Sequence, residues 1–489
     1  MKPFVKKALT VVLAAVCAVY LSACSLIGGD VATLMRPPRP PGELYEIQKV
    51  LESSVKDITM KYPRSGEFRS AYIMQDIDGD GQDEVLTFYS TKGDGQTSGT
   101  LYLHVLTRAS GKWKTLDSKV VKDAAGVETV AFVDLDNDGS LEIIVGYTLL
   151  AGIEKRLNVY AVDTALNEIF SQSYNDYLTA PLTRQTYAGT NIPMTNLLLI
   201  KLNATEPPVA SARLFTIDRT TSTEIGSATI DGSVSSYGRL QVTKSGDIAC
   251  VLIDAYKIDS SMITDVIYFD DASGMLKAPT FNPKTQQTEQ TFRRRTIDCR
   301  DIDGDGIIEI PYLSELPSID ATELTLTGDT SSHSTSVVPA SDNRVYLTNW
   351  MRYDVRDPAK SVSALTAQMN YYDDYYVRFP EKWLYTEAEA AELEFTGNAL
   401  SRVAVRRDIA ARESVFYEYD YVNLKPAVTL FTIKVFQESN WDAKIASDFI
   451  MLKKAGGLVY GLQLAESTSP LALTERELRE TYFSTINYQ

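Results

Sequence analysis

The stretch DIDGDGQDE, residues 76–84, carries acidic side chains at its first, third, fifth, eighth and ninth positions. Two further segments align with it without gaps, DLDNDGSLE at 134–142 and DIDGDGIIE at 301–309. Apolar, β-branched runs flank each copy, which is typical of a loop that joins two buried strands. Three occurrences of one loop indicate a structural unit that is repeated along the chain.

The spacing of the copies predicts further units between them. The first two copies start 58 residues apart (76 to 134), and the last two start 167 residues apart (134 to 301), close to three times the first interval. Two degenerate units that keep the strands and lose the acidic loop therefore fit near 191–200 and 250–269. Units of this length predict a β-propeller of about five four-stranded blades. Six or seven blades stay open, because the Ser- and Thr-rich stretch 316–340 is hard to divide.

The acidic loops have the composition of a site for a hard divalent cation. Ca²⁺ takes about six to eight oxygen ligands, and a short loop supplies them when alternate residues converge on one point. Carboxylates this crowded repel one another without a cation, so we expect about three structural Ca²⁺ ions. Mg²⁺ fits less well because it requires near-ideal octahedral geometry. Acidic turns that bind no ion are the alternative.

The expected ligands are the side chains at loop positions one, three, five and nine and the main-chain carbonyl at position seven. In chain order these are Asp76, Asp78, Asp80, Gln82 and Glu84; Asp134, Asp136, Asp138, Ser140 and Glu142; and Asp301, Asp303, Asp305, Ile307 and Glu309. A glycine at position six permits the sharp turn that this convergence needs.

An EF-hand also alternates acidic residues, but its bidentate glutamate stands at position twelve. That position holds Thr87, Val145 and Tyr312 here, and strands flank the loops. The pattern instead resembles the FG-GAP/VCBS-type repeats of integrin-alpha-like propellers, in outline over 64–370. The resemblance implies a propeller with structural Ca²⁺, used for adhesion or recognition.

The amino terminus has the features of an export signal. An apolar run at 8–20 follows positive charges and is too short to span a bilayer comfortably, so 1–23 is predicted to be a signal peptide. The quartet Leu-Ser-Ala-Cys that ends at Cys24 resembles the bacterial lipobox. The resemblance implies cleavage before Cys24 and a lipid on its sulfur. Residues 24–42, rich in proline, would tether a cell-surface lipoprotein to the membrane.

The remaining segments are predicted from periodicity. Apolar residues at helical spacing predict an amphipathic helix over 43–63, whereas 64–370 is all-β. Mixed strand and helix signals predict a smaller α+β domain over 371–489.

Two signals mark that last domain. Thr474 and Glu477 predict the capping box of a final helix, with Leu478, Tyr482 and Ile486 on its apolar face. The strand that ends in FPEKW at 379–383, together with this helix, looks like the PsbP-like fold.

Charge and rare residues exclude several function classes. A net charge of −16 makes nucleic acid an unlikely partner, and two histidines leave little room for hydrolytic triads or histidine-ligated metals. Cys250 and Cys299, both at strand ends, either pair with each other or remain buried free thiols.

The expected function is non-enzymatic binding of a glycan, an envelope component or a protein at the cell surface. The alternative is a polysaccharide lyase or glycosidase on a propeller scaffold, but no catalytic residue can be named. Two clusters have two interpretations each. The tyrosines at 371–376 stack on sugar rings or pack in a strand, and the arginines at 293–295 contact an anion or form a solvated strand.

Overall fold

The computed structural model describes residues 42–91, 99–150, 152, 154–203, 205–317, 344–386, 388–389, 401–423, 425–441 and 448–486. The predicted signal peptide, Cys24 and nearly all of the tether lie outside these ranges. Within them, no helix is both long and apolar enough to cross a bilayer. The chain forms two compact units that meet in sequence at 130/131, with 163–166 belonging to the first.

The first unit begins with helix α3 (Gly42–Ser54), whose Ile47 is fully buried against Val85, Leu106 and Trp113. The helix ends earlier than the predicted 43–63. Residues Ile58–Lys61 form strand β1 instead, paired with β3. The positive φ of Asp57 breaks the helical path, and the β-branched residues that follow favour a strand.

The sheet of this unit has the order β1-β3-β4-β5, with β2 also paired to β3. Its strands are β1, β2 (Tyr72–Gln75), β3 (Glu84–Thr91), β4 (Thr100–Ala109) and β5 (Lys112–Val121).

Three four-stranded antiparallel sheets come next in the sequence, and the unit boundary falls within β6. The second sheet holds β6 (Ala124–Val133), β7 (Glu142–Leu149), β8 (Lys155–Val162) and β9 (Leu166–Tyr174). The third holds β10 (Asp176–Ala180), β11 (Asn196–Asn203), β12 (Val209–Ile217) and β13 (Ser222–Asp231). The fourth holds β14 (Ser236–Ser245), β15 (Ile248–Tyr256), β16 (Met262–Asp270) and β17 (Met275–Lys277), followed by the hairpin β18 (Phe281–Asn282) and β19 (Gln287–Thr288).

Two five-stranded sheets complete the described chain, ordered β20-β21-β22-β23-β29 and β24-β25-β26-β28-β27. The fifth sheet holds β20 (Ile310–Glu315), β21 (Tyr346–Arg352), β22 (Val362–Asn370), β23 (Tyr375–Arg378) and β29 (Phe483–Thr485). The sixth holds β24 (Val403–Asp408), β25 (Glu413–Asp420), β26 (Lys425–Gln437), β27 (Ile450–Ala455) and β28 (Leu458–Leu464). The short helices are η1 (Pro358–Lys360), η2 (Glu381–Trp383), η3 (Glu438–Asn440), α6 (Glu475–Glu477) and η4 (Leu478–Tyr482).

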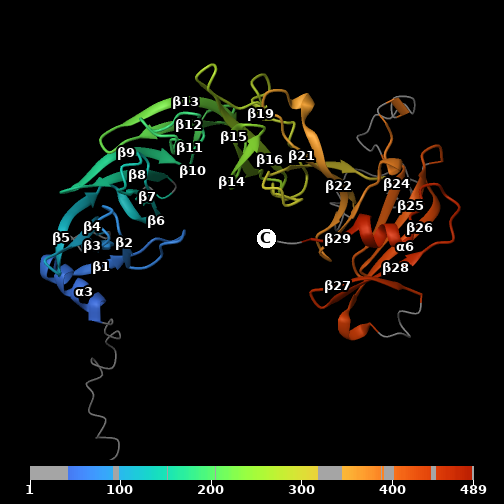
Figure 1. Cartoon of the computed structure of the whole chain (residues 1–489), viewed down its shortest axis with the longest axis horizontal. Coiled ribbons are helices and arrows are strands. Elements are labelled where there is room, and N and C mark those ends of the chain that lie inside the picture. Colours follow the sequence, from blue (N-terminus) through green and yellow to red (C-terminus); the bar gives the residue numbers. More distant parts are fainter. Residues whose placement is uncertain are drawn as a thin grey trace, which may run out of the picture. The chain divides into compact units, whose positions relative to one another are not determined.

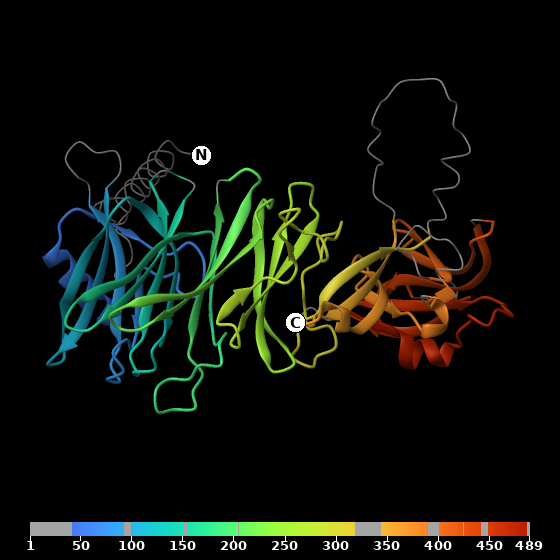
Figure 2. The same cartoon turned by 90° about the horizontal axis from the view of Figure 1, so that it is seen from above.

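Within the second unit each sheet shares a buried core with the next. Figures 1 and 2 show these sheets in order, from green β10–β13 to orange and red β21–β28. The inner strands are apolar on both faces for this reason. In β11, the four consecutive residues 197–200 all have 0% exposure, which a strand covered on one side only does not allow. The mainly β prediction is confirmed, and closure of the sheets into a propeller ring stays a prediction.

The expected domain boundary at 370/371 falls in the turn between β22 and β23, which pair in one sheet. The capping box of Thr474 and Glu477 is confirmed, with Thr474 Oγ1 accepting from Glu477 N at 3.2 Å. The helix it starts is short, however, and Ile486 lies beyond it, because 483–485 pairs with β23 as β29. The α+β layering and the PsbP-like resemblance stay predictions.

Candidate functional site

The three acidic loops occupy corresponding places in their sheets. The first joins β2 to β3, the second joins β6 to β7, and the third precedes β20, where a bridge between Arg300 and Glu309 closes it. Position six has a φ of 84° at Gly81, 91° at Gly139 and 84° at Gly306. Side chains other than glycine rarely adopt this left-handed conformation, so the backbone explains the repeated glycine.

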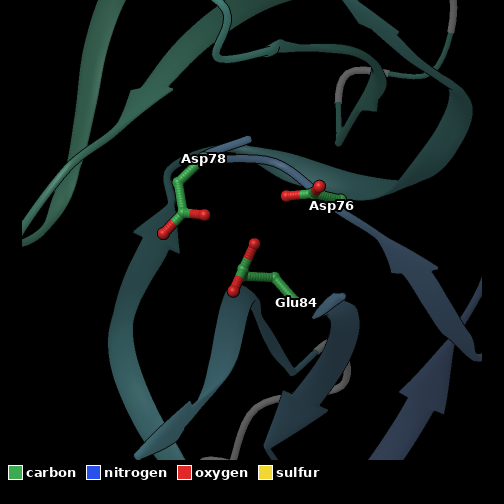
Figure 3. Close-up of side chains that lie close together, drawn as sticks. All are labelled: Asp76, Asp78 and Glu84. Carbon is green, nitrogen blue, oxygen red and sulfur yellow. The ribbon is translucent and has the colours of Figure 1, made fainter. Parts of the chain in front are cut away.

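Each loop brings together the carboxylates at positions one, three and nine. Their oxygens all lie within 4.8 Å of one another in each group. The groups are Asp76, Asp78 and Glu84; Asp134, Asp136 and Glu142; and Asp301, Asp303 and Glu309. Figure 3 shows the first group, with Asp76 and Asp78 turned from the loop toward Glu84 at the start of its strand.

The aspartate at position five lies outside each group. Asp80, Asp138 and Asp305 accept the N–H of position seven through one carboxylate oxygen, at 2.8, 2.8 and 2.9 Å. This bond spans the glycine at position six and fixes the turn there. The ligand role of these side chains, and of the carbonyls of Gln82, Ser140 and Ile307, stays a prediction.

The glutamate at position nine has a structural task in addition to its charge. Glu84, Glu142 and Glu309 are 2%, 1% and 0% exposed. Each accepts the main-chain N–H of loop position two through Oε2, at 3.0, 2.9 and 3.0 Å. The glutamate at position nine therefore links the two ends of the loop. It recurs in all three copies because it satisfies the buried N–H of position two.

Burial and mutual repulsion disfavour ionisation of these carboxyls. Burial raises the pKa of Glu142 to about 7, and the charges of Asp136, Asp138 and Asp134 add to the effect. Burial likewise raises the pKa of Glu84 and of Glu309. Positive charge placed in such a loop would restore the ionised forms.

Arginines from distant segments supply part of that charge in two loops. Arg352 at the end of β21 contacts Asp303 at 2.5 Å, Asp305 at 2.7 Å and Glu309 at 3.0 Å. In the second loop, Arg219 contacts Asp138 at 2.5 Å, and its main-chain N–H donates to Asp136 at 2.9 Å. No local sequence signal identified either arginine. The pairing of β21 with β20 brings Arg352 to its loop, whereas Arg219 lies in the turn between β12 and β13 of the next sheet.

The two middle sheets show what stands in place of the acidic loops. In the third sheet Asn196 stands at the start of β11, and its Oδ1 accepts from Leu182 N at 3.1 Å, as the glutamates do elsewhere. In the fourth, only Gly246 and Asp247 separate β14 from β15. A neutral amide thus replaces the loop-closing glutamate in one repeat, and a tight turn replaces the whole loop in the other.

The donor set of the three groups fits a hard cation. All ligand atoms are carboxylate oxygens, which Ca²⁺ prefers. In the second loop Asp134 Oδ1 is buried and has no hydrogen-bond partner among the described residues. A cation there would be held by Asp134, Asp136 and Glu142, and it would give this oxygen the partner that it lacks among the described residues.

Other predicted residues take structural positions. Cys250 and Cys299 are buried free thiols, and no disulfide joins them. Arg293 is fully buried and paired with Asp254. Tyr375 is 1% exposed and donates to Ser414 Oγ at 2.7 Å, so the packing interpretation holds for it.

Comparison with known proteins supports the repeat. Residues 76–145 match the model of the FG-GAP-like repeat, a span that includes the first two acidic loops. No curated protein matches the sequence.

Three of the solved structures that match this chain have low sequence identity and low TM-scores. A Bacillus licheniformis rhamnogalacturonan lyase has 11% identity and a TM-score of 0.26 over 51% of this chain and 58% of the lyase. Saccharomyces cerevisiae Sqt1 has 9% identity and a TM-score of 0.24 over 79% and 85%. An exo-β-1,3-galactanase from Clostridium thermocellum has 10% identity and a TM-score of 0.22 over 88% and 100%. This chain therefore spans less than two thirds of the lyase, and likenesses this weak carry no functional argument.

Proposed function

We propose that this chain is a membrane-anchored binding module of the cell surface, in which Ca²⁺ at the three acidic loops stiffens a scaffold of FG-GAP-like repeats. The observation that carries the proposal is the recurrence of one group, at loop positions one, three and nine, in three separate sheets. Each group joins a loop to the start of a buried strand. A cation held there links the two and offsets a repulsion that otherwise opposes folding.

Calcium titration of metal-free protein tests the scaffold. We expect heat on addition of CaCl₂, a higher melting temperature, and a reversal of both by chelator. Asp78→Asn removes a charge from the first group while keeping an oxygen for the bond from Asp80 N. This variant should lose the heat of one site.

Asp83→Asn is the matched control, since this exposed carboxylate belongs to the same loop and lies outside the group. It should bind calcium like the wild type. Absence of calcium heat together with an unchanged melting temperature would contradict the role of the loops.

A separate experiment tests whether Cys24 carries the lipid anchor. Expression in bacteria with labelled palmitate should label the wild type and place it in the membrane fraction. Cys24→Ala should abolish the label. Labelling that survives this substitution would reject Cys24 as the lipidated residue.

A further inference from the structure

One cavity concentrates positive charge on a chain whose net charge is −16. It has a volume of about 480 Å³, within the range of small-molecule sites. Four arginines line it, from the segment after the fourth sheet, from the residues just before β21 and from β24: Arg294, Arg295, Arg344 and Arg407. Of these, Arg344 is paired with Glu315 at 3.6 Å. Residues far apart in the sequence thus bring guanidinium groups to one hollow.

Among the residues that the structure describes, Arg407 forms no ion pair with a carboxylate. Its Nη2 donates to Asn370 Oδ1 at 2.8 Å, and within the described ranges no acidic side chain forms an ion pair with it. Burial lowers the pKa of Arg407, the charges of Tyr375 and Asp373 act in the opposite direction, and the charge of Arg295 lowers it further. Guanidinium stays protonated in proteins, so within the described residues this partly buried charge has no anion at ion-pair distance, and the nearby Asp373 is paired with Arg412 at 2.7 Å.

A second, independent feature is an unused hydrogen-bond acceptor. Gln368 on β22 is 1% exposed and lines the cavity. Its Nε2 donates to Met369 O at 2.9 Å, whereas its Oε1 has no hydrogen-bond partner among the described residues. A buried acceptor without a hydrogen bond is unfavourable, so a ligand that donates a hydroxyl to this atom would bind more tightly.

An aromatic ring completes the lining. The Arg295 guanidinium lies over the ring of Tyr346 at 5.3 Å from its centroid, and the Tyr346 hydroxyl is buried without a hydrogen-bond partner within the described residues. The stacked ring orients the guanidinium. The phenol adds another polar atom that a hydroxylated ligand could satisfy.

We propose that this cavity binds an acidic sugar unit, whose carboxylate contacts the arginines and whose hydroxyls contact Gln368 and Tyr346. A neutral sugar would offer no anion to the Arg407 guanidinium, which forms no ion pair within the described residues. Inorganic phosphate would supply the anion, but it offers few donors to the buried Gln368 oxygen. A uronate carries both groups on one ring. The inference deepens the proposed binding function, on which it rests, by naming the class of ligand.

Calorimetric titration of the full-length protein in detergent tests the site. The probes are trimers of galacturonate, glucuronate and mannuronate, a neutral galactose trimer, and inorganic phosphate. At least one uronate trimer should bind about tenfold more tightly than the neutral trimer and than phosphate. Equal binding of phosphate would overturn the sugar assignment, and failure of all three uronates would overturn the site.

Variants locate the binding. Arg294→Gln changes an exposed residue and Arg407→Gln a partly buried one, and each should weaken uronate binding about tenfold. Arg406→Gln is the control, because this neighbouring arginine on β24 is exposed and does not line the cavity. Equal loss in Arg406→Gln, or no loss in Arg294→Gln, would reject the cavity as the site.

Calcium heat measured on the same samples separates the two proposals. If the unmodified protein binds none of the uronates while its calcium heat is intact, the cavity proposal alone is refuted. Uronate binding without calcium heat refutes the loops alone.

Discussion

Arg293 Nη2 donates to Asp254 Oδ1 at 2.8 Å, and both side chains have 0% exposure. Asp254 also accepts from Thr264 Oγ1 at 2.6 Å and from Cys299 N at 2.8 Å. Of the three consecutive arginines at 293–295, the first is thus committed to the protein interior, and the other two line a cavity.

Breaking this buried pair should destabilise the second unit strongly. Arg293→Met leaves the Asp254 carboxylate without its cation in a site that water cannot reach, which costs about 3–5 kcal/mol. Urea denaturation measures the change. The double variant Arg293→Met, Asp254→Leu should lose less than the sum of the single variants, and strict additivity would show that the two side chains are not coupled.

The buried carboxyl of Asp265 should make the free energy of unfolding depend on pH. Burial raises its pKa from the ordinary 3.8 to about 7, and the charge of Asp231 adds to this. Between these pH values the folded chain keeps a proton that the unfolded chain has released. The free energy of unfolding should therefore fall as pH rises from about 4 to 7, by up to about 4 kcal/mol at this residue.

Asp265→Asn should remove that slope and stabilise the protein at pH 8 by about 2 kcal/mol, since its Oδ1 can still accept from Thr288. Denaturation curves at pH 4 and pH 8 provide the measurement. The exposed Asp83→Asn serves as the control and should leave the slope unchanged. A slope that persists in Asp265→Asn would assign it to another group.

Arg352 should compete with calcium in the third loop. Its guanidinium already contacts three carboxylates there, so a cation has to displace it. Arg352→Met should tighten calcium binding at this loop about tenfold and lower the melting temperature of the metal-free protein. Calorimetry and thermal denaturation provide the two measurements.

The exposed Arg356→Met is a matched control for Arg352→Met, because Arg356 lies on the same segment and forms no ion pair with the loop within the described residues. It should change neither quantity. Weaker calcium binding in Arg352→Met would mean that the arginine supports the site and does not compete for it.

The thiols of Cys250 and Cys299 should resist alkylation in the folded protein because they are buried, although they form no disulfide. Burial raises the pKa of Cys250 to about 12 and that of Cys299 well above its usual range, so neither forms the reactive thiolate. Iodoacetamide followed by peptide mass spectrometry should find both unmodified in native protein and alkylated after denaturation. A disulfide-linked peptide containing both cysteines would contradict the free-thiol structure.

The sequence by itself determined the acidic loops, their flanking strands and the capping box of Thr474 and Glu477, because each depends on residues within about ten positions of one another. It also located the middle repeats, which keep strand patterns while losing the loop. Local periodicity overextended the first helix, since Ile58 continues the helical spacing of apolar residues and yet residues 58–61 pair with β3.

Only the tertiary structure showed which partners reach the loops and the cavity. Arg352 lies 49 residues from Asp303, and Arg407 lies 37 from Asn370, so no motif links them. The placement of 483–485 beside β23, far from the rest of its sheet in sequence, was equally hidden. Strand pairing and packing set these contacts, and side chains that meet in this way leave no spacing that a single sequence reveals.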